Sequence, residues 1–145
     1  MPIQLQDWHY EEYQQLLEKN CVSKDHIIVL ININASDLCI ERRWPLINFK
    51  AVIQELAKKK QIIQFLTGSK EEHAYNQRCI DQIDKFSLNR VHNIAGEISI
   101  GGFLALLQHV HLLLTNDSGP MHLAGLMNCP MVSLWGPGTP QSYAP

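Results

Sequence analysis

The feature that most constrains the fold is a pair of apolar runs that each end in a loop of small and polar residues. The first run, 110–114, is followed by Asn-Asp-Ser-Gly over 116–119 and then by Pro120. The second run, 131–135, stops at Gly-Pro-Gly over 136–138. Proline is favoured in the first turn of a helix, so the first run predicts a buried strand that leads directly into a helix. Two such strands side by side would place both loops at the carboxyl edge of a parallel sheet, where open α/β sheets bind ligands.

The rest of the chain alternates between short apolar runs and longer amphipathic segments. Strands are expected over 26–33, 61–67, 89–94, 109–115 and 131–135. Helices are expected between them over 46–60, 69–86, 99–107 and 120–127. Strands and helices in this order predict a parallel sheet with right-handed crossovers and helices on both faces. The predicted fold class is α/β: a three-layer, Rossmann-like domain with a parallel sheet of about five strands.

Residues 1–25 precede this alternation. They contain a polar helical segment over 5–20, whose inner face is expected to carry Trp8, Tyr13, Leu16 and Leu17. We interpret 1–25 as a linker or appended helix, and 26–145 as the Rossmann-like domain.

Composition and charge exclude several classes of partner. The formal net charge is −2, and no basic surface for nucleic acid is indicated. No apolar run approaches the ~20 residues that span a bilayer, so no transmembrane segment is expected. The cysteines are far apart and form no C-x-x-C motif; they are Cys21, Cys39, Cys79 and Cys129. A reduced, cytoplasmic protein is therefore expected.

The loop after the strand over 109–115 is the clearest candidate for an anion site. Ser118 and Gly119 lack bulk, so their backbone N–H groups can face a phosphate at the start of the next helix. Asp117 would repel a phosphate, so we expect it to hold the loop or to bind a sugar hydroxyl. His122, in the first helical turn, could donate to either kind of ligand group. Two alternatives stay open: Asp117 as a simple turn residue and His122 as a surface histidine.

Charged residues follow the first two strands at the same edge. Arg42 and Arg43 come after a small, polar turn over 34–36, and a guanidinium can bind a diphosphate through two donors. One of these two arginines is the expected countercharge, unless both are solvated. Glu71 and Glu72 lie where a ribose would be placed, and a carboxylate can accept from ribose hydroxyls. Acidic residues that favour a helix N-terminus are the alternative.

Several familiar motifs are missing. The chain has no G-x-G-x-x-G and no G-x-x-x-x-G-K-[ST], which argues against a dehydrogenase domain and a P-loop NTPase. It also lacks the G-x-S-x-G motif of a nucleophile elbow. Without a D-x-D pair or a histidine cluster, no metal site and no cofactor are expected, and diphosphate charge would be met by arginine and amides.

Residues 115–140, TNDSGPMHLAGLMNCPMVSLWGPGTP, resemble the signature of the heptosyltransferase-like glycosyltransferases, glycosyltransferase family 9. The usual form of that signature is close to TNDTGPMHLAAALGTPVVALFGPTDP. The family also carries N-P-G-A-S followed by K-R-W-P, and the segments 32–36 and 42–45 are similar to these. The resemblance covers about 26–145. It implies the donor-binding, carboxyl-terminal half of a GT-B fold, which binds a nucleotide-diphospho-sugar, typically ADP-heptose, and transfers the sugar with inversion in lipopolysaccharide core synthesis.

The resemblance also implies roles for individual residues. The amides of Ser118 and Gly119 would bind the diphosphate, with Asp117 and His122 beside the transferred sugar. Arg42 falls where the family usually has a lysine that meets the phosphates. The remaining implied donor-binding residues are Ser36 near the phosphates, Glu71 or Glu72 at the ribose, and Gly136 in the second loop. No catalytic residue is expected in this chain.

The chain departs from the family pattern at particular positions. Ile33 and Asn34 replace the Pro and Gly of N-P-G-A-S, and Gly138 with Thr139 replaces the Thr and Asp of G-P-T-D-P. The family's acceptor-binding domain, which supplies the general base, has no counterpart in 1–25. We therefore expect a piece truncated at its carboxyl end that transfers no sugar alone. Its full-length parent is expected to be cytoplasmic, at the periphery of the inner membrane.

Two other functions stay open at this point. One is half of another GT-B enzyme, such as a nucleotide-sugar epimerase, in which a D-S-G loop also binds a diphosphate. The other is a non-enzymatic α/β module whose exposed sheet edge mediates self-association. Nucleotide binding separates the two enzymes from the module, and dependence on an acceptor separates the transferase from the epimerase.

Overall fold

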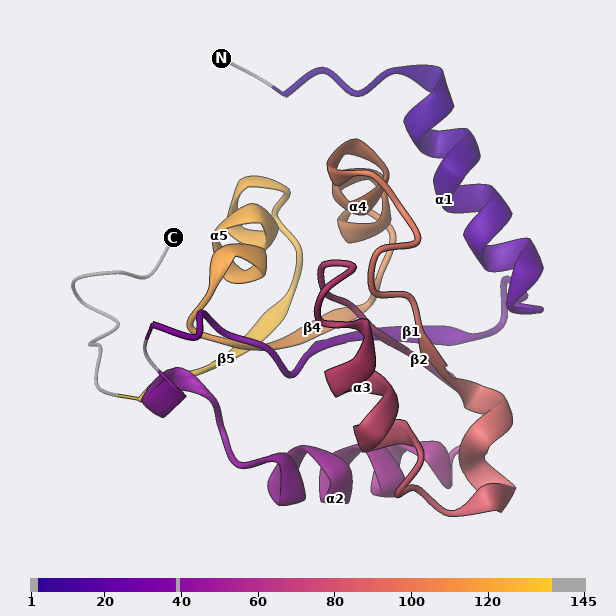
Figure 1. Ribbon diagram of the computed structural model, residues 1–145. Helices are drawn as coiled ribbons and strands as arrows, with labels where there is room; N and C mark the ends of the chain where they lie inside the picture. Colours follow the sequence, from indigo (N-terminus) through magenta and orange to yellow (C-terminus); the bar gives the residue numbers. More distant parts are fainter. Residues whose placement is uncertain (1–2, 39, 137–145) are drawn as a thin grey trace.

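The computed structural model describes residues 3–38 and 40–136, and its helices and strands alternate along the chain (Figure 1). The strands are β1 (Ile27–Asn32), β2 (Ile62–Leu66), β3 (Val91–Asn93), β4 (Leu112–Asn116) and β5 (Met131–Leu134). The α-helices are α1 (Asp7–Lys19), α2 (Leu46–Ala57), α3 (His73–Ile80), α4 (Ile100–Leu107) and α5 (Gly119–Leu126). Short 3-10 helices, η1 (Ile40–Arg42) and η2 (Lys85–Arg90), lie in the connections.

The strands pair in parallel in the order β3-β2-β1-β4-β5. The chain moves outward from β1 to β3 and then crosses back, so that β4 lies on the other side of β1. This confirms the predicted α/β, Rossmann-like fold, with its parallel sheet and neighbouring β4 and β5. The strand order reverses between β1 and β4, and ligands of open α/β sheets bind at the carboxyl ends of strands at such a reversal.

The sheet is buried on both faces, which explains the unbroken apolar run of β1. Leu30 and Phe65 belong to the core beneath α1, α4 and α5, whereas Ile31 and Leu66 belong to the core beneath α2 and α3 (Figure 1). The register places Leu30 opposite Phe65 and Ile31 opposite Leu66, so each core continues across neighbouring strands. Both cores stabilise the sheet edge at which the polar loops gather.

α1 packs against α4 at a pair of glycines. A side-chain carbon on Gly101 would overlap the His9 ring, and one on Gly102 would overlap the Glu12 carboxylate. Both glycines lie in the first turn of α4, and the close approach of α1 explains why residues of poor helix propensity stand there. The placement of Trp8 on the inner face was wrong, because His9 and Glu12 face α4 and Trp8 is 54% exposed.

α3 is shorter at both ends than the predicted helix over 69–86. It begins at His73 because the Glu72 carboxylate accepts the backbone N–H of Ser69 at 2.8 Å and closes a turn ahead of the helix. It ends at Ile80, and the chain continues through turns into η2. The bond between Ser69 and Glu72 thus resembles one half of a capping box, but it closes a turn rather than the first turn of the helix.

The elements on either side of the Asn-Asp-Ser-Gly loop also shift by a few residues. α5 begins at Gly119, so Pro120 is its second residue rather than its first. β4 begins at Leu112 because the N–H of His109 still bonds to the carbonyl of Leu106 at the end of α4. Within the residues that the structure describes, no helix combines the length and the apolar character needed to cross a membrane.

Candidate functional site

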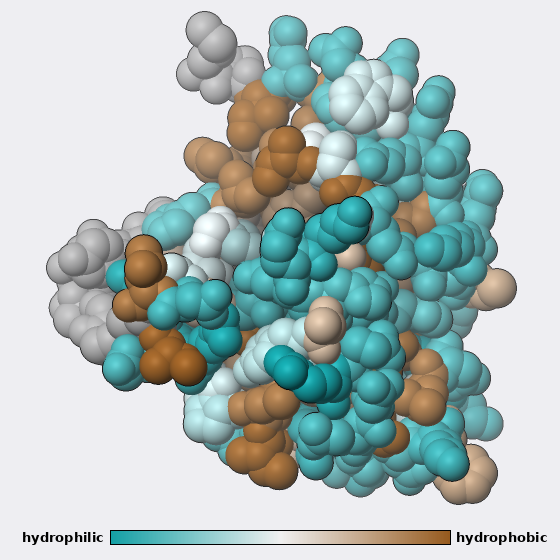
Figure 2. Space-filling model, in the orientation of Figure 1, coloured by the Kyte–Doolittle hydropathy of each residue, from teal (hydrophilic) through white to brown (hydrophobic). Residues whose placement is uncertain are grey.

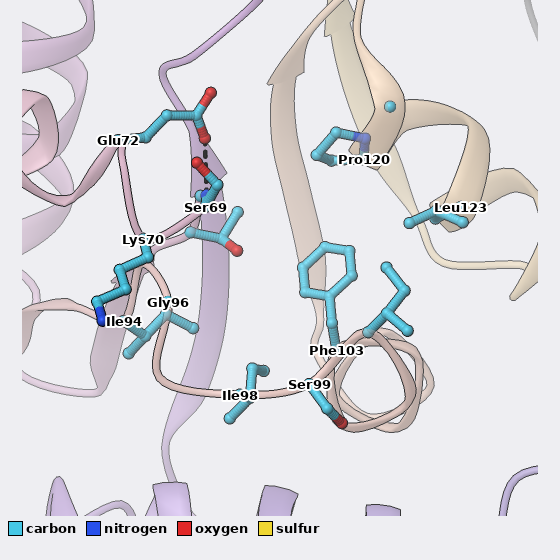
Figure 3. Close-up of a pocket in the computed structure, with 14 residues that line it drawn as sticks. Ser69, Lys70, Glu72, Ile94, Gly96, Ile98, Ser99, Phe103, Pro120 and Leu123 are labelled. Carbon is cyan, nitrogen blue, oxygen red and sulfur yellow. Dashed lines mark hydrogen bonds between the residues drawn. The ribbon is translucent and has the colours of Figure 1, made fainter.

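Two cavities lie next to each other at the carboxyl edge of the sheet, and Glu72, Gly119 and Pro120 line both of them. The larger has a volume of about 470 Å³ and lies between the β2–α3 loop and the helices α4 and α5 (Figure 3). The smaller has a volume of about 140 Å³ and is bounded by the end of β1, the residues that follow it and the start of α5. Both cavities flank the reversal of strand order.

The larger cavity has an apolar wall and a polar rim. Figure 3 shows Phe103 and Leu123 on the side of the helices, facing Ser69 and Glu72 on the opposite side. On the molecular surface, hydrophobic colour gathers over α4 and α5, above the hydrophilic surface of the β2–α3 loop (Figure 2). An apolar wall with polar groups along one side suits a flat aromatic ligand that carries a hydroxylated substituent.

The start of α5 offers backbone N–H groups to these cavities. Pro120 has no N–H, and the N–H of Met121 donates to the carbonyl of Ser118 at 3.1 Å, so the amides of Ser118 and Gly119 can face a ligand. A side-chain carbon built on Gly119 meets no other atom within 4 Å. The helix therefore begins in open space, as an anion site at a helix N-terminus requires.

A buried amide, Asn32, holds the Ser118 hydroxyl in place, and sequence reasoning had not singled it out for this role. Its Nδ2 donates to Ser118 Oγ at 2.7 Å, to Thr115 Oγ1 at 3.0 Å and to the carbonyl of Asn34 at 3.2 Å. Because this hydroxyl is already engaged, the backbone of Ser118 is the part left to contact a ligand. The available signal was an asparagine that ends an otherwise apolar strand, because a buried amide needs partners.

A second buried amide, Asn116, fastens the loop after β1 to the end of β4. Its Oδ1 accepts the backbone N–H of Trp44 at 2.9 Å, and its Nδ2 donates to the carbonyl of Asn34 at 3.2 Å. The loops that line the smaller cavity are thus joined by side-chain bonds as well as by the sheet. Such bonds hold a site in one geometry before a ligand arrives.

Arg42 lies against Asp117 rather than among the residues that line the smaller cavity. Its Nε is 3.7 Å from Asp117 Oδ2, and the Asp117 side chain is only 5% exposed, whereas that of Arg42 is 38% exposed. Arg42 Nε is buried and has no hydrogen-bond partner within the described part of the chain. The structure therefore brings Arg42 together with Asp117, and Arg42 is not among the residues that line the smaller cavity with Ser118 and Gly119.

Arg43 is occupied within its own loop. Its Nη2 donates to the carbonyl of Ala35 at 2.8 Å and pairs with the Asp37 carboxylate, while its guanidinium lies 5.2 Å from the centre of the Tyr75 ring. These contacts fold the segment between β1 and α2. Of the two arginines considered from the sequence, Arg42 is the one whose guanidinium is not fully engaged by its own loop.

The structure separates the two glutamates that the sequence left as alternatives. Glu72 lines both cavities, and its Oε2 accepts the Ser69 N–H. Glu71 is exposed and lines neither cavity. A backbone hydrogen bond within Glu71 and a bond from the Ser69 hydroxyl lower the pKa of the Glu71 carboxyl. Glu72 is therefore the carboxylate that faces a ligand in either cavity.

The remaining predicted site residues occupy different places. Ser36 lines the smaller cavity and its Oγ accepts the N–H of Leu38 at 3.2 Å. His122 is exposed on α5 and lies outside the lining of both cavities. Gly136 lines a separate cavity of about 130 Å³ together with Arg42, where a side-chain carbon would approach the Glu41 carbonyl to 2.5 Å. The rest of the second loop, 137–138, lies outside the described residues.

The described residues contain no group of three or more His, Cys, Asp or Glu side chains that could hold a metal ion. The donors that line the two cavities are instead backbone amides, amide and hydroxyl side chains and the Lys70 ammonium, while the Arg42 guanidinium lies outside both linings, beside Asp117. Their arrangement can bind an anion beside a hydroxylated group, with an apolar ring in the larger cavity.

Comparison with known proteins identifies the family. The sequence pattern of glycosyltransferase family 9 (heptosyltransferase) matches residues 2–145. Lipopolysaccharide heptosyltransferase 2 of Escherichia coli strain K12 is 29% identical over 105 residues, which make up 72% of this chain and 30% of that protein. The chain thus spans about 30% of the length of this curated relative.

Solved structures have the same fold. The ADP-heptose LPS heptosyltransferase II of E. coli superposes with a TM-score of 0.80 and 23% identity, over 96% of this chain and 40% of that one. The glycosyl transferase family 9 protein of Veillonella parvula DSM 2008 superposes with a TM-score of 0.87 and 24% identity, over all of this chain and 40% of that one. These superpositions show a shared fold, and the match of the family pattern over almost the whole chain shows that the chain belongs to glycosyltransferase family 9, the heptosyltransferases.

Proposed function

We propose that this chain is the donor-binding half of an inverting glycosyltransferase of lipopolysaccharide core synthesis, and that its ligand is a nucleotide-diphospho-sugar of the ADP-heptose kind. The observation that carries the proposal is the pair of adjoining cavities around the open start of α5. Membership of family 9 and the ADP-heptose in the name of the E. coli structure support the choice of ligand.

The two cavities suggest how the donor lies. The larger one takes the nucleoside base against Phe103 and Leu123, because an aromatic base gains from an apolar wall. The carboxylate of Glu72, which lines both cavities, accepts a ribose hydroxyl between them. The diphosphate then lies at the amides of Ser118 and Gly119, where the positive end of the helix dipole favours an anion.

The negative charge of the diphosphate needs a countercharge. Arg42 is the candidate because its side chain is 38% exposed and lies beside Asp117, the residue that precedes Ser118. We propose that Arg42 binds the phosphates from its place beside Asp117, and that no metal or cofactor takes part. Titration of the same donor in the presence of a chelator should then give an unchanged Kd.

Sugar transfer needs a second partner. With inversion, an acceptor hydroxyl attacks the anomeric carbon as its bond to the diphosphate breaks, a general base takes the hydroxyl proton, and the nucleoside diphosphate leaves. Because the chain spans 30% of the curated relative, we propose that the acceptor-binding domain and the base belong to the part of such proteins that this chain does not cover. The chain alone then binds donor without transferring sugar. We place the complete protein in the cytoplasm, at the periphery of the inner membrane.

Calorimetry on the full chain tests the proposal. ADP and an ADP-sugar should bind, and Ser118→Glu should abolish binding because it places a carboxylate against the phosphates. Ser23→Glu is the matched control, since it adds the same charge at an exposed site that precedes β1, at the opposite edge of the sheet. Failure of the wild-type chain to bind either nucleotide, or unchanged binding by Ser118→Glu, would refute the proposal.

A further inference from the structure

Asn34, just beyond the end of β1, has a buried oxygen that lacks a partner. The residue is 2% exposed. Its Nδ2 donates to the carbonyl of Thr67 at 3.3 Å and to Asn76 Oδ1 at 2.9 Å. A carbonyl can only accept, so the contact with Thr67 fixes which end of the amide is nitrogen. Asn34 Oδ1 therefore points away from these partners, and within the described residues it has none.

Asn34 is held from behind by other buried groups. Asn76, on α3, donates from its own Nδ2 to the Thr67 carbonyl at 3.1 Å and to Asn93 Oδ1 at 3.4 Å. Asn93 in turn donates to the carbonyl of His73 at 3.0 Å. This row of amides anchors Asn34 to α3 and β3, so its free oxygen is held in a fixed place. An acceptor that is buried, oriented and unpaired is uncommon in folded proteins and calls for a ligand or a water.

Asn34 lies next to the carboxylate that we assign to the ribose. A side-chain carbon on Gly68 would lie 2.8 Å from Glu72 Oε2 and 3.0 Å from Asn34 Nδ2, so both side chains rest against the same glycine. Asn34 and Glu72 also line the 140 Å³ cavity together with Ser118. Glu72 already gives one oxygen to the Ser69 N–H, so a ligand with two neighbouring hydroxyls would be better served by a second acceptor.

We propose that Asn34 Oδ1 accepts a hydrogen bond from one ribose hydroxyl while the Glu72 carboxylate accepts one from the other hydroxyl. This proposal rests on the proposed donor-binding function. Asn34 is then a specificity-determining residue that recognises one of the two ribose hydroxyls, and together with Glu72 it selects a ribose that carries both. The N-P-G-A-S segment that the chain resembles has glycine at this position, so the amide acceptor belongs to this chain's own sequence.

Calorimetry with three ligands tests the assignment: ADP, 2′-deoxy-ADP and 3′-deoxy-ADP. The wild-type chain should bind ADP about tenfold more tightly than either analogue, since each analogue leaves one buried acceptor unpaired. In Asn34→Ala, discrimination against one analogue should disappear and discrimination against the other should remain. Asn93→Ala is the matched control, because it removes an amide from the same row at a position that lines neither cavity, and both discriminations should persist.

Each outcome decides the question. If Asn34→Ala still discriminates against both analogues, Asn34 Oδ1 binds only water and the assignment is overturned. The proposed donor-binding function is then unaffected. A wild-type chain that binds no ADP would overturn this assignment and the proposed function together. If Asn34→Ala fails to fold, Asn34→Gly takes its place. The wild-type chain also tests the assignment without any variant: if it discriminates against fewer than two of the deoxy analogues, Asn34 and Glu72 do not both accept a ribose hydroxyl.

Discussion

Gly119→Ala separates the needs of the fold from those of the ligand. The added methyl meets no atom within 4 Å, and Gly119 is the first residue of α5, without the left-handed backbone that would strain an alanine. Replacing glycine at such a position removes conformational freedom from the unfolded chain. The free energy of unfolding should therefore rise by about 0.4–1 kcal/mol.

The same methyl should weaken donor binding. It would occupy the open space in front of the Gly119 amide, where we place a phosphate oxygen. Losing one hydrogen bond to a charged group costs about 1.5–3 kcal/mol. The Kd for ADP should thus rise by roughly 10- to 150-fold. A substitution that stabilises the protein while it weakens binding is expected only where a glycine is kept for a ligand.

Urea unfolding and calorimetry on one preparation measure both effects. Gly101→Ala is the matched control: it makes the same change at the start of α4, where the new carbon overlaps the His9 ring, so it should lower stability and leave the Kd for ADP unchanged. Unaltered ADP affinity in a stabilised Gly119→Ala would refute the placement of the diphosphate. A loss of stability would refute the reading of this space as open.

Three further predictions concern charge and burial. Arg42→Ala should lower the free energy of unfolding by about 1–2 kcal/mol, because the nearly buried Asp117 carboxylate loses its cation. In urea titrations, adding Asp117→Asn to this variant should restore most of the lost stability. A double variant that recovers no stability would argue against the ion pair. Burial lowers the pKa of His92 below its ordinary 6.5, so the unfolded chain binds a proton at this imidazole more readily than the folded one. The stability of the protein should therefore fall as the pH drops below 6.5. His92→Leu should flatten that part of a plot of the urea midpoint against pH, and an unchanged slope would contradict the prediction. Burial also raises the pKa of the Cys79 thiol to about 11, so iodoacetamide at pH 8 should modify exposed Cys21 first and Cys79 only after unfolding, as read by mass spectrometry of digested peptides.

The fold was predictable because its signals are local. A strand buried on both faces must be apolar along its length, and the runs at β1, β2, β4 and β5 show this directly. The strand expected over 89–94 is present as the short edge strand β3. The predicted bounds were wrong at the ends of several elements, as where β4 begins at Leu112 rather than His109. The end of an element depends on individual hydrogen bonds, and the spacing of apolar residues along the sequence does not reveal these.

The place of the candidate site was predictable for a related reason. Small and polar residues after two neighbouring parallel strands must meet at one sheet edge, and the loop that contains Ser118 and Gly119 lies there. The choice between Glu71 and Glu72 was not predictable, since both follow the same strand and only one lines the cavities. The pairing of Arg42 with Asp117 likewise joins residues from separate loops.

The amino-acid sequence by itself determined the α/β class, the parallel sheet and the edge at which the polar loops gather, because each follows from the spacing of apolar residues and from turn residues within a short window. Tertiary structure alone decided which polar groups are paired and which buried ones lack a partner within the described residues. Asn34, which follows β1, donates hydrogen bonds to Asn76 on α3 and to the carbonyl of Thr67 after β2. A contact between side chains that are distant along the chain leaves no local pattern, and it exists only once the strands that carry them have packed.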